Sequence, residues 1–210
     1  MTRSFLSAIA LAAAGLALAA PTATEVRELA AFDDVVWEAA GELLIQQSHR
    51  ERLSIEAEPA VLAKIVTEVR QRRLRIGFAP GSIQTRHPIR FRLETRQLLA
   101  FEARGSGSVR IAALSTPQLL LVLNGSGDIQ LAQLSARNLE VRLAGAGNIA
   151  VDGGPVRDAH VSIGGSGQVR VAASERLTAS IAGSGMLFYR GRPQITQSIT
   201  GAGLIRPAGE

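Results

Sequence analysis

The stretch GSGDIQLAQLSARNLEVRLAGAG, residues 125–147, holds one complete unit of a repeat that fills the second half of this 210-residue chain. A Gly-(Ser/Ala)-Gly tripeptide opens and closes the unit, and it occurs six times, at steps of 20, 20, 20, 18 and 18 residues. The glycines of the six tripeptides are Gly105 and Gly107, Gly125 and Gly127, Gly145 and Gly147, Gly165 and Gly167, Gly183 and Gly185, Gly201 and Gly203. A nearly fixed period of this length predicts a stacked repeat architecture.

Apolar residues alternate with polar or small ones on both sides of each tripeptide. Leu123, Leu143 and Ile163 stand two positions before it, and Ile129 and Ile149 stand two positions after it. Period two is typical of strands with one buried face. A strand–helix–strand crossover needs about 30 residues or more, so it does not fit the repeat. We therefore predict an all-β fold, a right-handed parallel β-helix or β-solenoid with coils of about 20 residues.

The repeated glycines are expected at corners between two strands. At such a corner the backbone needs a positive φ or approaches the next coil closely, and glycine allows both. We interpret all twelve as structural. The alternative is that the stacked corners form a groove whose backbone N–H groups face an anion. A nucleotide-binding loop is not expected, because the tripeptide opens no helix and recurs six times.

The chain before the repeats is expected to contain three parts. Residues 1–19 have the pattern of a secretory signal, with Arg3 before a short apolar stretch and small residues before Ala20; an uncleaved anchor is the alternative. Residues 20–31 are expected to be a linker. Six short period-two runs follow within residues 32–97, and one helical turn is expected at 59–62. We predict that residues 32–97 form a non-repeating β part that caps the solenoid of residues 98–210. The six runs are residues 32–37, 42–46, 52–57, 65–69, 74–78 and 89–93.

Charge is uneven along the chain. The formal net charge is +5, and residues 70–110 hold ten arginines against only Glu94 and Glu102. Such a surplus favours an anionic partner, for example an anionic polysaccharide or another envelope component. The alternative is a solvated strand face that discourages aggregation. Nucleic acid is not expected, because aromatic residues are only 4% of the chain. The candidate binding residues are Arg70, Arg72, Arg73, Arg75, Arg90, Arg92 and Arg96.

Several segments together resemble one known family. They are the Phe32-Asp33 opening, the strand at 53–57, corners such as that at 125–129, and the endings at 189–193 and 199–203. Over residues 30–206 the chain resembles the putative auto-transporter adhesin head domain, or head GIN domain, of exported bacterial proteins. The family's Gly-Ile-Asn-like stretch reads Gly41-Glu42-Leu43 here, which is a departure. The resemblance implies a β-helical exported domain with an adhesive role, and it transfers no catalytic residues.

No catalytic or metal-binding constellation stands out. His49, His87 and His160 are scattered and lack partners at metal-ligand spacing. Asp158, His160 and Ser162 would share one face of a strand, but nothing suggests a nucleophile elbow, so we interpret them as outward polar positions. The chain has no cysteine. Between the first and last tripeptides the acidic residues, spread over several coils, are Asp128, Glu140, Asp152, Asp158 and Glu175.

The sequence thus predicts an exported, non-catalytic binding or adhesin-like domain at the bacterial cell envelope, in the periplasm or on the surface. We expect no cofactor and no metal, and the ligand and oligomeric state stay open. One alternative is a carbohydrate-active β-helix enzyme, which would hold two carboxylates about 5–9.5 Å apart in a cleft. Another is an envelope signalling accessory that binds a membrane partner through its arginine-rich half.

Overall fold

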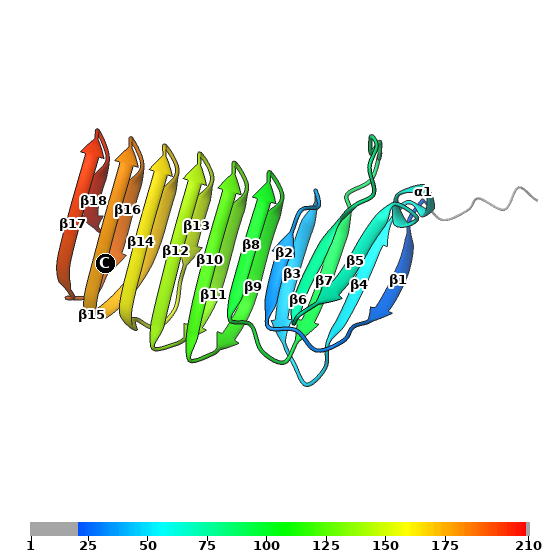
Figure 1. Ribbon diagram of the computed structural model, residues 1–210, viewed down its shortest axis with the longest axis horizontal. Coiled ribbons are helices and arrows are strands. Elements are labelled where there is room, and N and C mark those ends of the chain that lie inside the picture. The colour runs from blue at the N-terminus through cyan, green and yellow to red at the C-terminus, as the bar shows by residue number, and fades with distance from the viewer. Residues whose placement is uncertain (1–20, 209–210) are drawn as a thin grey trace, which may run out of the picture.

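A computed structural model describes residues 21–208 of the chain, and the predicted signal at 1–19 lies outside the described residues. Strands stacked side by side make up nearly all of it, as Figure 1 shows, and only 2% is helical. The predicted β-solenoid is confirmed, with about five turns and coils of about 20 residues. No helix among residues 21–208 is long and apolar enough to cross a membrane.

The strands form two layers, sheet A and sheet B, joined by the long strand β15 (Gln168–Gly183), which starts in sheet A and continues into sheet B. The other strands of sheet A are, in spatial order, β1 (Ala23–Glu28), β4 (Arg52–Ala57), β7 (Arg90–Thr95), β3 (Glu42–Gln47), β9 (Ser108–Ser115), β11 (Asp128–Ser135), β13 (Asn148–Val151), β16 (Met186–Arg190) and β18 (Leu204–Pro207). Those of sheet B are β5 (Ile65–Arg70), β6 (Arg73–Phe78), β2 (Asp34–Trp37), β8 (Ala100–Gly105), β10 (Gln118–Gly125), β12 (Asn138–Gly145), β14 (Val156–Gly165) and β17 (Gln194–Gly201).

Parallel pairing places equivalent positions of successive repeats beside each other. Leu121 pairs with Val141, and Val141 pairs with Val161, at the 20-residue step. Val161 then pairs with Ala179, at the 18-residue step. The period shortens because residues 152–155 leave the strand as a turn, whereas the next coil runs through this region as β15. The change in coil length is absorbed by a register shift between Val156 and Asp158, and the core positions that follow stay aligned along the stack.

The core lies between the two sheets and consists of the alternate apolar residues. Leu121, Val141 and Val161 are fully buried. Large aromatic side chains lie in the N-terminal part of the core, where the rings of Trp37 and Phe91 meet edge to face with centroids 4.7 Å apart. Burial of these side chains is the main source of the fold's stability.

Residues 32–97 extend the stack and then change its pairing. All six predicted runs are strands, and the predicted helical turn is α1 (Pro59–Leu62). β2 and β3 pair in parallel with β8 and β9 of the repeats, and with β6 and β7 on their other sides. Beyond these strands, β4, β1 and β5 join by antiparallel pairing. The prediction of a linker at 20–31 is wrong for residues 23–28, which form the edge strand β1. Both faces of β1 are largely exposed, so apolar and polar residues alternate only weakly along it.

The corners stack directly on one another. Gly145 has φ +130°, and a Cβ there would collide with the carbonyl oxygen of Gly125 in the preceding coil. Gly127 lacks a positive φ, but its Cβ would lie 2.5 Å from the oxygen of Gly107. The N–H groups of Ala146 and Gly147 donate to the Gly125 oxygen at 3.1 and 3.2 Å. Because these N–H groups are used along the stack, the corner does not offer them to an anion.

The two ends of the stack differ. α1 and the antiparallel strands lie at the N-terminal end, whereas the coil of β17 and β18 ends the stack at the other side (Figure 1). Every residue of β17 is exposed, including Ile195 and Ile199, which occupy core-facing positions but are 39% exposed. Within residues 21–208 nothing covers this last coil.

Candidate functional site

The seven arginines predicted as a binding patch lie on different parts of the molecule. Arg73 and Arg75 are on β6 of sheet B, and Arg90 and Arg92 are on β7 of sheet A. Arg70 and Arg72 lie at the β5–β6 hairpin, and Arg96 follows β7. The structure therefore does not bring the seven together on one surface.

Six of the seven arginines have carboxylate partners. On the sheet B side, Arg73 Nε lies 2.6 Å from Asp34 Oδ2, because β6 pairs with β2. The longest contact is that of Arg90, which is 3.8 Å from Glu42 and 3.6 Å from Glu56. The remaining ion pairs are Arg70 with Glu68, Arg72 with Asp33, Arg75 with Glu38, and Arg96 with Glu51.

These partners explain why the expected excess of positive charge is largely neutralised. All of these acids precede residue 70, so a count of charges within residues 70–110 does not include them. Pairing of β2 with β6 brings Asp34 to Arg73, 39 residues away. This pair could have been predicted from the sequence by pairing the strand expected at 32–37 with the strand expected at 74–78.

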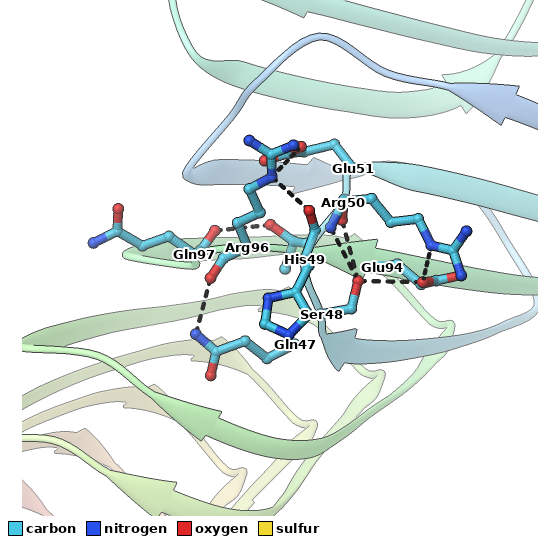
Figure 2. A network of polar contacts seen from close by, with 9 residues as sticks. Gln47, Ser48, His49, Arg50, Glu51, Glu94, Arg96 and Gln97 are labelled. Carbon is cyan, nitrogen blue, oxygen red and sulfur yellow. Dashed lines mark hydrogen bonds and ion pairs between the residues drawn. The ribbon is translucent and has the colours of Figure 1, made fainter.

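Arg96 belongs to a polar network that joins two connections between strands (Figure 2). Its Nε donates to the His49 carbonyl oxygen at 2.8 Å and lies 3.2 Å from the buried Glu51 carboxylate. Nearby, Arg50 donates to Glu94 at 3.0 Å, and this hydrogen bond lowers the pKa of Glu94 below its ordinary value. The network fixes the β3–β4 connection against the end of β7, which is a structural role.

Arg92 is the one predicted arginine without a carboxylate within 4.0 Å in the described part of the chain. Its strand position pairs with Leu44 on β3, and Leu44 pairs in turn with Arg110 on β9. Arg110 also lacks an ion pair among residues 21–208. Two exposed, uncompensated guanidinium groups therefore flank one half-buried leucine on the outer face of sheet A.

A shallow depression of about 420 Å³ lies at this place. Besides Arg92, Arg110 and Leu44, its lining includes Ser54 of β4 and Thr24 of β1. Glu42, Glu56 and Arg90 also line it, and they are joined by the long ion pairs described above. Leu43 and Phe91 add apolar surface to the lining. The depression combines this apolar surface with hydroxyl groups and two guanidinium groups that have no carboxylate partner among residues 21–208, which suits an oxygen-rich anionic ligand. Sequence reasoning missed Arg110 as a site residue.

A second hollow, of about 590 Å³, lies on the outer face of sheet B. It contains Glu140, Asp158 and His160, which point outward as expected. Arginines neutralise both acids: Arg142 lies 2.6 Å from Glu140, and Arg176 lies 2.7 Å from Asp158. Among residues 21–208 no group of three His, Asp or Glu side chains is arranged to hold a metal ion.

Together these features define the class of protein, a two-sheet β-solenoid whose candidate sites are open, shallow faces of its sheets. The chain belongs to the family described as putative auto-transporter adhesin, head GIN domain, whose model matches residues 31–155 and 155–193. This confirms the resemblance found in the sequence. No curated protein matches the chain.

Solved structures share the fold. A putative adhesin from Bacteroides fragilis is 21% identical, with a TM-score of 0.76 over 89% of this chain and 97% of that one. A putative adhesin from Parabacteroides merdae is 17% identical, with a TM-score of 0.63 over 90% and 96%. A protein from Parabacteroides distasonis described as a putative lipid binding protein is 24% identical, with a TM-score of 0.60 over 90% and 97%. These similarities concern the fold alone.

Proposed function

We propose that this protein is an exported, non-catalytic binding domain of the bacterial cell envelope, and that it recognises an anionic glycan or another anionic envelope polymer. Membership of an adhesin family supports a binding role and a location outside the cytoplasm. The net charge of +5 favours an anionic partner. Arg92 and Arg110 beside the depression on sheet A are the observation that carries the proposal.

These two arginines are suited to bind because no internal carboxylate competes for them. An arginine that is already paired must separate from its carboxylate partner before it binds a ligand. For an exposed ion pair this separation costs about 0–1 kcal/mol, which reduces the gain from binding. An arginine without a carboxylate partner keeps its fork of N–H donors available for carboxylate, sulfate or phosphate groups. Ser54 and Thr24 add hydroxyl groups that match the hydroxyls of a sugar.

The non-catalytic part of the proposal rests on the state of the acids. Glu140 and Asp158, the acids of the hollow on sheet B, are each bound to an arginine. Arg157 likewise lies 2.8 Å from Glu175. A glycosidase uses two carboxyl groups that face each other across its substrate, whereas these three acids each face an arginine in an ion pair.

Binding to immobilised polygalacturonate and to lipopolysaccharide tests the proposal. Wild type should be retained at low salt and released near 0.15 M salt, where the Debye length is about 8 Å. The double variant Arg92→Gln, Arg110→Gln should lose most of this retention. Arg73→Gln with Arg75→Gln is the matched control, because both arginines are exposed but ion-paired on sheet B, and it should bind like wild type. Absence of wild-type retention on both polymers at low salt would refute the proposed function.

A further inference from the structure

The outer face of sheet A carries four arginines in a single row across the strands. The row consists of one residue from each successive strand between β7 and β18, and each residue is paired in register with the next. We call it the arginine row. In spatial order it reads Arg92, Leu44, Arg110, Gln130, Ala150, Arg170, Phe188 and Arg206.

The arginines of the row differ from most others in the molecule. None of the four has a carboxylate within 4.0 Å among the described residues, whereas thirteen other arginines of residues 21–208 form ion pairs. On sheet B the equivalent outward positions hold compensated pairs, such as Arg142 with Glu140. The row is therefore a line of four available guanidinium groups on one sheet.

Acidic residues limit the row on both sides. Asp128 lies two residues before Gln130 on β11, and it accepts a hydrogen bond from the Asn148 side chain at 2.7 Å. Asp152 lies two residues after Ala150, just past the end of β13. A broad and densely charged polyanion would meet these carboxylates as well as the arginines, and like charges repel it. A narrow chain that follows the row avoids them.

The spacing of the row excludes one small anion as the ligand of all four arginines. Neighbouring strands lie about 4.8 Å apart. Arg92 and Arg110 are thus separated by about 10 Å, Arg110 and Arg170 by about 14 Å, and Arg170 and Arg206 by about 10 Å. The whole row spans about 34 Å. Only a chain with repeated negative charges reaches several of these positions at once.

Two hollows lie along the same line. The depression of about 420 Å³ contains Arg92 and Arg110, and a smaller one of about 220 Å³ contains Ala150 and Arg170. The small side chain of Ala150 leaves the second hollow open beside its arginine. At two separate places the row thus combines an unpaired guanidinium group with a hollow in the surface.

We propose that the ligand is an extended acidic polysaccharide that lies along the stack axis, across the strands, and contacts the arginine row from Arg92 to Arg206. This inference rests on the proposed function and adds to it the direction and minimum length of the ligand. Each arginine beyond the first contact turns a separate binding event into an intramolecular one, so affinity increases with chain length until the row is filled.

Affinity for oligogalacturonides of increasing length, from below about 10 Å to above about 34 Å, tests the inference. Wild type should bind progressively more tightly as the oligomer lengthens, and its affinity should stop rising near the length of the row. The variant Arg170→Gln, Arg206→Gln should bind short oligomers like wild type, and its affinity should stop rising at about 10 Å, the distance between Arg92 and Arg110. The matched control is Arg142→Gln with Arg176→Gln, two exposed, paired arginines of sheet B, which should follow the wild-type curve.

The outcomes separate the two proposals. If wild type binds and the Arg170, Arg206 variant has the same length dependence, the arginine row is refuted and the proposed function stands. If wild type binds no oligomer and no polygalacturonate but is retained on lipopolysaccharide, the arginine row is refuted as a site for an acidic polysaccharide and the proposed function stands. If wild type binds none of the three at low salt, both are refuted. Thermal melting of each variant establishes that the comparison concerns folded protein. Arg206, Arg142 and Arg176 are exposed, and such substitutions change stability only slightly, whereas Arg170 is half-buried, so its variant needs this measurement most.

Discussion

Replacement of Gly145 by alanine should destabilise the solenoid more than replacement of Gly105, although the two residues have nearly the same backbone. Their φ angles are +130° and +121°, so each alanine is strained by about 1–3 kcal/mol. The surroundings differ. A Cβ at Gly105 meets no atom within 4 Å, whereas a Cβ at Gly145 collides with the Gly125 oxygen. Relief of that collision moves an oxygen that accepts two hydrogen bonds, from Ala146 and Gly147.

The extra loss of stability in Gly145→Ala, beyond the backbone strain, comes from weakening those two hydrogen bonds. Each contributes about 0.5–1.5 kcal/mol, so the contact between coils should add about 1–3 kcal/mol for Gly145→Ala. With a urea m-value of about 2 kcal/mol/M, its unfolding midpoint should lie about 0.5–1.5 M below that of Gly105→Ala. Ser126→Ala is the control and should unfold like wild type, because alanine already occupies the equivalent positions 146 and 202. Equal midpoints for the two glycine variants would show that backbone strain alone explains the corners and that stacking contact does not.

Two further predictions concern the N-terminal half. Glu94→Gln should lower the unfolding midpoint at neutral pH, and the difference between the variant and wild type should vanish in acid. The hydrogen bond from Arg50 lowers the pKa of the Glu94 carboxyl in the folded state. The stability that this bond contributes is therefore present above the ordinary carboxyl pKa and is lost as the pH falls through the folded-state pKa. A difference that persists in acid would contradict this assignment. Phe91→Ala should lower the free energy of unfolding by about 3–5 kcal/mol. It should also shift the fluorescence emission of Trp37, the only tryptophan, to longer wavelength, because the two buried rings are in contact. Unchanged fluorescence would show that the core around Trp37 does not loosen.

The parts of the fold that the sequence predicts well are those that depend on local periodicity. Alternation around Leu123 and Ile129 identifies two strands, and the glycines between them identify the corner. β1 escaped prediction because a strand with Val26 46% exposed shows little contrast between its two faces. Local pattern is strong where one face is buried and weak at an edge.

The candidate site was less predictable because it depends on register between distant strands. The acid that neutralises Arg73 lies 39 residues away and meets it only when β2 lies against β6. The arginine row nevertheless left a signal in the repeats. Arg110, Arg170 and Arg206 each stand three residues after the closing glycine of a tripeptide, a position that the apolar pattern does not include. Alignment of the repeats on their outward positions would have found them.

The exposed last coil determines the order in which the molecule opens. Because each coil bonds only to its neighbours, the free energy of local opening accumulates along the stack. Within residues 21–208 the coil of β17 and β18 has one neighbour, and its core-facing Ile195 and Ile199 remain 39% exposed. This coil should therefore open first and exchange its amide hydrogens fastest. Protection should then increase coil by coil toward Trp37 and Phe91. Arg206 lies on the coil that opens most readily, so a ligand that reaches it would slow exchange at this end of the molecule most.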